Sequence, residues 1–399
     1  MPGMIFPISF TMVVALHFFT HYPMAGIYLH IPFCKQACTY CNFHFSTSLK
    51  MKDELLQALL RELELQRNYL QGHSIETIYF GGGTPSLLTA AEIMRITDRI
   101  YELYPVGELK EFTLEANPDD LTVAYLRELR HTPVSRFSIG IQSFKEQDLR
   151  YMNRAHTAQE ADYAIKAAQD AGFDNLSIDL IYGTPGLSDA DWKYNLAQVR
   201  DLRIPHFSAY ALTVEEGTAL HHNIAKKKAT PVDSGQAAAQ FEILAEQAEA
   251  MGYDHYEISN LALPGHHAVH NTNYWRGLPY LGVGPAAHSF DGRNERRWNV
   301  ANNALYIKGL LGENRIPHEQ ETLTPEQHLN EYIMTSLRTM WGCDLDKVTR
   351  EWHGDYARQV LNDAALFIDK GQLLHNGSTL VLTHRGKLFA DYIAGELFV

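Results

Sequence analysis

Short apolar segments alternate with helical patterns six times between Gly26 and Thr213, and this rhythm limits the fold more than any other feature of the chain. Strands that alternate with helices predict a parallel sheet covered by those helices. Six units fall short of the eight in a complete (β/α) barrel. We therefore predict an α/β fold, an open partial (β/α)6 barrel. The predicted strands span residues 27–32, 77–82, 111–117, 136–142, 176–182 and 207–212.

The segments between these strands carry helix signals. Leucines at 56, 59, 60 and 63 fall on one helical face. Thr89 and Glu92 form a capping box, which predicts a helix start at that point. Further helices are predicted over residues 120–130, 158–171 and 189–202.

The rhythm changes after Thr213, which predicts additional domains. A lysine-rich connector at 226–228 precedes a helix over 233–251, a strand over 253–259 and a long loop over 264–298. A capping box at Thr324 and a hairpin with an Asn376-Gly377 turn follow the second change, near Pro317. We predict a barrel over 24–225, an extension with this loop over 226–316, and a small winged-helix-like domain over 317–399.

Charge and the first residues exclude some classes of protein. The 399 residues carry a net charge of −13, so a broad nucleic-acid-binding surface is not expected.

Residues 4–22 are apolar, but Pro7 interrupts them and no Lys or Arg precedes Lys35. A secretory signal needs a basic start, and a membrane span needs about 20 apolar residues. We read residues 1–23 as a non-structural leader, with Met24 as the working start, and expect a cytoplasmic protein.

Three cysteines within eight positions carry most of the functional information. Cys34, Cys38 and Cys41 form C-x3-C-x2-C directly after the first predicted strand, while Cys343 is remote. Structural zinc sites use four ligands, usually from paired C-x2-C units. Three thiolates on one loop instead suit a [4Fe–4S] cluster with one iron open to another ligand. A zinc-binding module and three packed thiols are the alternatives.

Polar or glycine residues stand where several predicted strands end. Gly82 lies in a Gly-Gly-Gly-Thr-Pro run, Glu115, Gln142 and Asp179 end the third to fifth strands, and Arg154 follows the fourth. The C-terminal ends of parallel strands meet at one edge, which is where barrels place their chemistry. The pattern predicts one ligand pocket at this edge.

Together these residues resemble the radical S-adenosylmethionine (SAM) superfamily, and the resemblance narrows to the branch of oxygen-independent coproporphyrinogen III oxidase, from Gly26 to the C-terminus. It implies a radical-SAM barrel with SAM bound to the open iron. The implied contacts to this SAM are Tyr28, Gly82, Glu115, Gln142, Arg154 and Asp179. Tyr40, Gly83, Thr84 and Ala211 align with contacts to a second SAM in the oxidase.

Two departures separate the chain from the oxidase. The oxidase has a further Cys two positions after the third cluster Cys, where this chain has Phe43. The polar extension that precedes the first strand of the oxidase is also missing. We therefore expect no coproporphyrinogen oxidase activity. Whether a second SAM binds is left undecided by the sequence.

A motif from His270 to Trp275 points to another branch. His-Asn-Thr-Asn-Tyr-Trp, with the Gly-rich stretch from Leu281 to Ser289, resembles the haem chaperone (HemW) branch. Imidazole is a good axial ligand for haem iron, and Tyr274 and Trp275 suit a porphyrin face. The resemblance implies haem bound through His270 and handed to apo-haemoproteins at a respiratory membrane by a monomer or dimer. Competing ligands are His266, His267 and His288; competing functions are the oxidase and another radical-SAM reaction.

Overall fold

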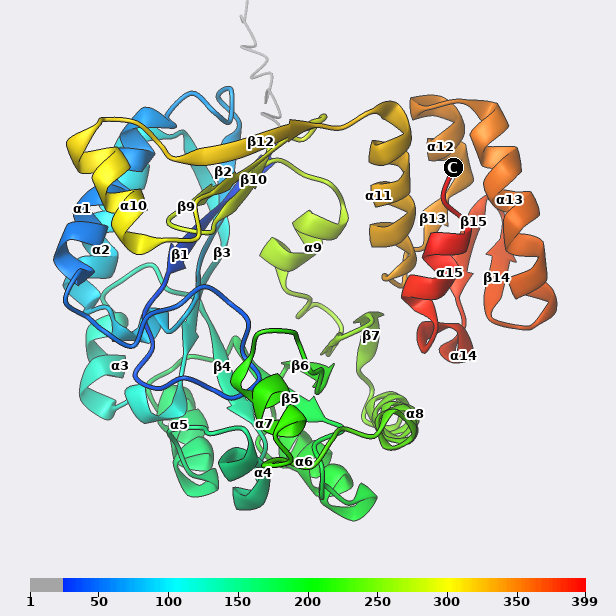
Figure 1. The fold of residues 1–399 in the computed structure, drawn as a ribbon, viewed down its shortest axis with the longest axis horizontal. Coiled ribbons are helices and arrows are strands. Elements are labelled where there is room, and N and C mark those ends of the chain that lie inside the picture. Colours follow the sequence, from blue (N-terminus) through cyan, green and yellow to red (C-terminus); the bar gives the residue numbers. More distant parts are fainter. Residues whose placement is uncertain (1–23) are drawn as a thin grey trace, which may run out of the picture.

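The computed structural model describes residues 24–399, and the predicted leader, residues 1–23, lies outside this part. One large sheet organises most of the chain. Its strand order is β12-β11-β10-β9-β1-β2-β3-β4-β5-β6-β8-β7. Figure 1 shows this sheet curving around helix α9 (Val269–Trp275), with the C-terminal domain to one side.

The six predicted strands form the centre of the sheet, and they pair in parallel with one another. This confirms the predicted α/β fold with a partial (β/α)6 barrel. Apolar side chains such as Ile27, Phe80 and Ile178 are fully buried, as expected for strands covered on both faces. The strands are β1 (Met24–Ile31), β2 (Ser74–Gly82), β3 (Val106–Ala116), β4 (Arg136–Gln142), β5 (Leu176–Tyr182) and β6 (His206–Ala211).

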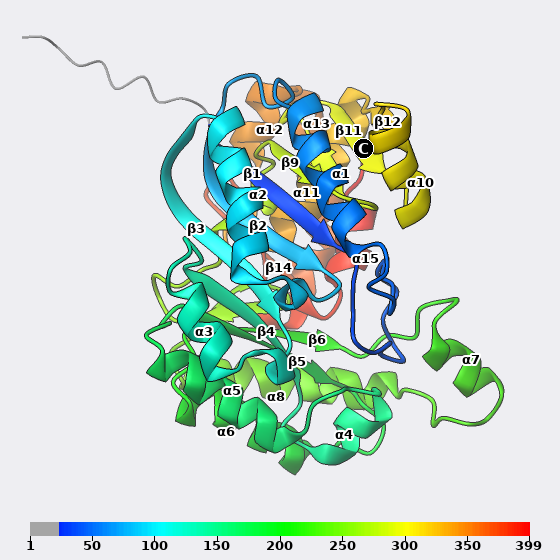
Figure 2. The same cartoon turned by 90° about the vertical axis from the view of Figure 1, so that its left-hand side faces the viewer.

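Helices cover the outer face of these strands (Figure 2). The predicted capping box at Thr89 is confirmed and starts α2. The helix predicted over 120–130 is shorter, because residues 118–120 form a 3-10 turn and the Thr122 hydroxyl caps the helix that follows. The helices are α1 (Lys52–Leu65), α2 (Ala90–Leu103), α3 (Val123–Leu129), α4 (Glu146–Tyr151), α5 (Ala158–Asp170) and α6 (Asp189–Asp201).

The extension widens the sheet at both edges, and here the prediction of a loop over 264–298 is wrong. β9 (Tyr280–Val283) pairs in parallel with β1, and β10 (His288–Phe290), β11 (Glu295–Asn299) and β12 (His318–Thr322) continue antiparallel. The predicted strand 253–259 contains β7 (Asp254–Glu257), and a second short strand, β8 (Asn260–Ala262), follows it and pairs with both β7 and β6. Such short strands have no clear periodicity, because pairing with existing sheet edges stabilises them. The remaining helices here are α7 (Ala219–Ala225), α8 (Ser234–Ala250), α9 (Val269–Trp275) and α10 (Asn303–Ile307).

A second hydrophobic core lies in the C-terminal domain, and Leu329, Cys343 and Phe367 are among its buried members. The predicted hairpin is present, with Asn376 paired to Thr379, so the turn is Gly377-Ser378, one residue later than expected. The elements are α11 (Pro325–Leu337), β13 (Cys343–Asp344), α12 (Leu345–Glu351), α13 (Gly354–Asp369), β14 (Leu373–Asn376), β15 (Thr379–Leu382), α14 (His384–Lys387) and α15 (Ala390–Glu396).

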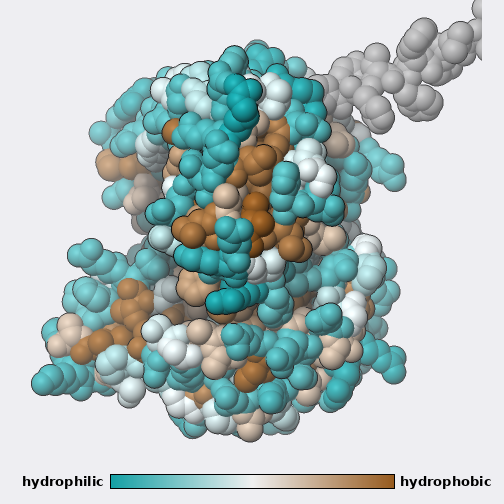
Figure 3. All heavy atoms as spheres, turned by 90° about the vertical axis from the view of Figure 1, so that its right-hand side faces the viewer, coloured by the Kyte–Doolittle hydropathy of each residue, from teal (hydrophilic) through white to brown (hydrophobic). Residues whose placement is uncertain are grey.

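The outer face of this domain is partly apolar. Figure 3 shows apolar side chains gathered on it, and Leu366 and Leu374 are each more than half exposed. Across residues 24–399, no helix combines the length and the apolar character that crossing a membrane requires.

A buried carboxyl group joins the extension to the barrel. Glu62 of α1 is fully buried and accepts hydrogen bonds from the Gly284 N–H, at 2.9 Å, the Asn299 amide, at 2.7 Å, and the Tyr306 hydroxyl. Burial is the main cause that raises the pKa of Glu62 from 4.5 to about 7. The folded state therefore binds more protons than the unfolded state between these two values.

The stability of the protein is expected to depend on pH through Glu62. Because its pKa is raised on folding, its contribution is full below about pH 4.5 and is lost as pH rises through about 7. The loss is up to about 3 kcal/mol. Urea denaturation of the wild type and of Glu62→Gln between about pH 5 and pH 8 measures it, because the variant lacks this titration. Parallel pH profiles would contradict the assignment.

Candidate functional site

The cysteine loop begins where β1 ends and is closed at its base by the backbone. The Cys34 N–H donates to the Ser46 carbonyl, at 3.0 Å, and the Ser46 N–H donates to the Pro32 carbonyl, at 2.9 Å. Cys34, Cys38 and Cys41 are all partly exposed and unpaired with any disulfide partner among the described residues. The loop therefore presents three free thiols at the C-terminal edge of the sheet.

The Gly-rich end of β2 packs directly against this loop. The Gly83 N–H donates to the Ile31 carbonyl, at 3.0 Å, and the Thr84 N–H donates to the Phe33 carbonyl, at 2.6 Å. A Cβ at position 83 would lie 2.6 Å from the Phe33 oxygen, so no larger residue fits. Gly82 has φ +105, which also requires glycine. These glycines thus hold the cysteine loop against the sheet.

Arg154 links the loop to the ends of β3 and β4. Its Nη1 donates to Cys38 Sγ, at 3.3 Å, and its Nη2 donates to Asn117 Oδ1 and the Gly140 carbonyl, both at 2.7 Å. Its Nε is buried and has no partner within residues 24–399. A buried guanidinium with an unused donor fits the carboxylate of a bound ligand.

Two carboxyl groups lie inside the barrel at the same edge. Glu115 accepts hydrogen bonds from the Tyr79 hydroxyl, at 2.8 Å, and from the Gly82 N–H, at 3.0 Å. Burial raises the pKa of Glu115 to about 7, and the charge of Asp179 contributes to the rise. Burial likewise raises the pKa of Asp179 to about 6. Both groups gain from a cationic ligand, which would restore their charged form.

Gln142 ends β4 in a strained conformation. Its φ is +67, in the left-handed region that side chains other than glycine rarely adopt, and the residue is buried. A Cβ at Gly140 would lie 3.0 Å from Gln142 Nε2 and 3.2 Å from Arg154 Nη2, so the two side chains meet over Gly140. Strain of this kind often marks a functional site.

The remaining predicted contacts occupy four different places around this edge. The Tyr28 ring packs beside Tyr79, with centroids 5.9 Å apart, close to Glu115. Tyr40 packs against the apolar cluster that contains Met152 and Leu220. Thr84 accepts a hydrogen bond from the Asn117 amide, at 3.2 Å. Ala211, at the end of β6, lines a groove between the barrel and the C-terminal domain.

His270 lies on helix α9 and not on a loop. It is buried, its Nδ1 is hydrogen-bonded to the Thr77 hydroxyl, at 2.8 Å, and its Nε2 to the Tyr274 hydroxyl, at 2.7 Å. Its ring stacks on Tyr79, and burial lowers its pKa to about 3. Both ring nitrogens are thus in use, and iron coordination requires Tyr274 to be displaced.

Sequence reasoning missed a polar network in the barrel interior. Arg136 is 2% exposed, donates to Thr113 at 3.4 Å, and has a buried Nε without a partner in the described chain. Glu111 accepts from the N–H groups of Val269 and His270 and so holds the N-terminus of α9. The available signal was a charged residue in each of two predicted strands, Glu111 in 111–117 and Arg136 in 136–142, because a charge inside a buried strand needs a polar partner.

The donor set fits a cluster better than a single ion. Among the described residues, no three His, Cys, Asp or Glu side chains converge as ligands of one metal ion. In a cluster each thiolate binds a different iron, so the three need not converge. Burial raises the pKa of Cys34 to about 11 and that of Cys41 above its ordinary value. These thiols are therefore protonated in the metal-free protein, and a metal would have to displace the protons to bind.

The chain is similar to known proteins over most of its length. The radical SAM superfamily model matches residues 28–198, and the HemN C-terminal domain model matches 323–389. Heme chaperone HemW from Mycobacterium tuberculosis is 34% identical over 93% of this chain and 94% of its own length. HemW from Bacillus subtilis is 33% identical over 93% and 98%. The solved coproporphyrinogen III oxidase HemN from Escherichia coli superposes with a TM-score of 0.81 over 95% of this chain and 92% of its own, at 21% identity, which shows a shared fold.

Proposed function

The chain belongs to the haem chaperone HemW family of the radical SAM superfamily, and from this premise we propose that it binds haem and transfers it to apo-haemoproteins. The similarity to HemW over nine-tenths of both chains carries this proposal. We also propose a cytoplasmic location and acceptors at a respiratory membrane.

We propose that Cys34, Cys38 and Cys41 hold a [4Fe–4S] cluster whose fourth iron binds SAM. When bound, this pair supplies one-electron chemistry at the sulfonium of SAM. Arg154 is positioned to bind the SAM carboxylate with its free Nε, and Glu115 and Asp179 to accept hydrogen bonds from its cationic and ribose groups. Tyr28, Gly82 and Gln142 complete the proposed pocket. The second-SAM contacts, Tyr40, Gly83, Thr84 and Ala211, stay predictions.

The alternative function is oxygen-independent coproporphyrinogen III oxidase. The solved oxidase shares the fold, and at 21% identity this likeness shows nothing further. Phe43 occupies the position of an additional Cys in the oxidase, and its side chain is 67% exposed. An exposed phenyl group supplies neither a thiol nor a proton, and this departure from the oxidase disfavours the alternative.

Haem titration of the purified protein is expected to give a Soret band that saturates at a fixed stoichiometry. Coproporphyrinogen III with SAM and a reductant is expected to give no protoporphyrinogen IX, because Phe43 replaces the thiol. Difference absorption spectra and chromatography of the porphyrins measure the two results. Robust decarboxylation without haem binding would replace the proposed function with the oxidase.

The role of His270 is tested in the same titration. If His270 binds the iron, His270→Ala should shift the Soret band as well as weaken binding, because the axial ligand changes. His375→Ala, on the exposed hairpin of the C-terminal domain, is the control. An unshifted band in folded His270→Ala would assign His270 to holding α9 through Thr77 and Tyr274.

A further inference from the structure

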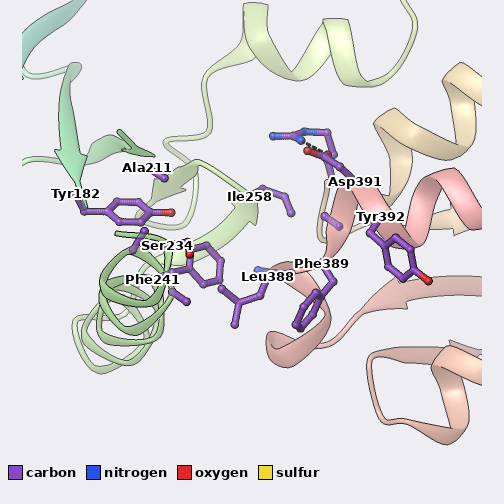
Figure 4. Close-up of a pocket in the computed structure, with 14 residues that line it drawn as sticks. Tyr182, Ala211, Ser234, Phe241, Ile258, Leu388, Phe389, Asp391 and Tyr392 are labelled. Carbon is purple, nitrogen blue, oxygen red and sulfur yellow. Dashed lines mark hydrogen bonds and ion pairs between the residues drawn. The ribbon is translucent and has the colours of Figure 1, made fainter. Parts of the chain in front are cut away.

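A groove of about 380 Å³ lies between the barrel and the C-terminal domain, beside the end of β6 (Figure 4). Pockets that bind small molecules have volumes of roughly 300–1,000 Å³. The groove is separate from the cysteine loop, although Ala211 lines it. None of the residues proposed to contact the cluster-bound SAM lines the groove, so it is a candidate ligand site beside that pocket.

The two walls of the groove are apolar and aromatic. Tyr182 and Phe241, with ring centroids 6.4 Å apart, stand on the barrel side, and Leu388 and Phe389 stand on the opposite side (Figure 4). Phe389 is 46% exposed, and a molecule that filled the groove would cover its ring. Flat apolar molecules are the ligands that such facing walls accommodate.

A cation without a carboxylate partner borders the same groove. Lys387 Nζ donates to the His255 carbonyl, at 3.0 Å, and no ion pair with a carboxylate is formed by Lys387 within residues 24–399. Arg338, also at the groove, is already paired with Glu257, at 3.0 Å, and Asp391, at 2.9 Å. Burial lowers the pKa of Lys387 to about 8, so most of the amine is charged at neutral pH. A partly buried ammonium of this kind favours an anionic group on the ligand.

Helix α9, which contains the motif that resembles the haem chaperones, contacts a residue of the groove. The Arg338 guanidinium lies over the Trp275 ring, 5.6 Å from its centroid. Trp275 ends the motif that starts at His270, so the C-terminal end of the motif positions a side chain that lines the groove. His270 itself is buried against Thr77 in the barrel interior.

We propose that this groove binds the porphyrin ring of haem, with the ring between the two apolar walls and a propionate carboxylate at Lys387. The proposal rests on the proposed haem-chaperone function and specifies where the ring is held, whichever group binds the iron.

Substitutions on α8 test the groove with little risk to the fold. Ala238 is exposed and lines the groove, whereas Ala239 is exposed on the same helix and does not line it. Ala238→Trp should weaken haem binding about tenfold or more by filling the groove, and Ala239→Trp should leave it unchanged. Absorbance titration measures both, and circular dichroism confirms that the variants are folded.

Two further ligands show how much the porphyrin ring and the carboxylates contribute to binding, independently of the iron. Iron-free protoporphyrin IX should bind the wild type and lose affinity in Ala238→Trp, because the walls contact the ring and not the metal. Lys387→Met should weaken the free diacid about tenfold and leave its dimethyl ester unchanged, since only the diacid offers a charged partner. Porphyrin fluorescence gives the affinities.

The outcomes distinguish the groove from the function. If the wild type binds haem and Ala238→Trp binds it equally well, the groove proposal is overturned and the chaperone function stands. If the wild type binds neither haem nor the iron-free porphyrin, the proposed function fails and the groove proposal fails with it. If haem binding is weakened in Ala238→Trp and unchanged in Ala239→Trp, the result supports both the groove proposal and the chaperone function.

Discussion

Cys34→Ala, Cys38→Ala and Cys41→Ala should each remove the iron–sulfur cluster, so that iron falls from about four atoms per chain to near zero after anaerobic reconstitution. Each thiolate is the sole protein ligand proposed for its iron, and loss of one leaves two irons without protein ligands. Iron and acid-labile sulfide analysis, with the absorption spectrum, measures the loss.

Cys343→Ala is the matched control for this experiment. Cys343 is fully buried in the core of the C-terminal domain, away from the loop, and burial raises its pKa to about 12. Its truncation costs stability through a small cavity but no ligand. Stoichiometric zinc without labile sulfide in the wild type would overturn the cluster assignment.

Arg154→Ala should abolish the effect of SAM on the electron paramagnetic resonance signal of the reduced cluster. The affinity for SAM should fall about 100-fold, because charge-assisted hydrogen bonds to a carboxylate contribute about 1.5–3 kcal/mol each. Equilibrium binding of SAM gives the affinity. Arg150→Ala, an exposed arginine four residues earlier, should leave both measurements unchanged.

Arg154 also donates to Cys38, so the cluster content of the variant is measured in parallel. Arg154→Lys keeps the charge but lacks the planar fork, and it should keep the cluster while binding SAM weakly. If SAM perturbs the signal of Arg154→Ala as it does that of the wild type, the assignment of Arg154 to the SAM carboxylate is wrong.

The central sheet was predictable because its strands are long and buried on both faces. Ranges 136–142 and 176–182 agree with β4 and β5 at both ends. The run Met24–Ile31 is nearly continuous in apolar residues, which is the pattern of a covered parallel strand. The loop predicted over 264–298 failed for the opposite reason. β9 and β10 are four and three residues long, and pairing stabilises them: β9 pairs with the edge of β1, and β10 pairs with β9.

The candidate site divides in the same way. The order of the strands predicts Glu115 and Gln142 at one edge, because parallel strands end together, and β3 and β4 do end at these residues or one residue later. The prediction that Asp179 ends the fifth strand is wrong, since β5 continues for three more residues, to Tyr182. The barrel interior was not predictable, since the contact of Glu111 with the start of α9 joins residues 158 positions apart.

The sequence by itself determined the family, the alternation of strands and helices, and the cysteine loop, because these depend on residue types at short spacing. Only the tertiary structure decided the place of His270, which sits in a helix with both ring nitrogens bonded instead of on an open loop. Only the tertiary structure also revealed the groove that both Phe241 and Leu388 line. Burial and close approach between distant segments arise from packing, which no local pattern of residues records.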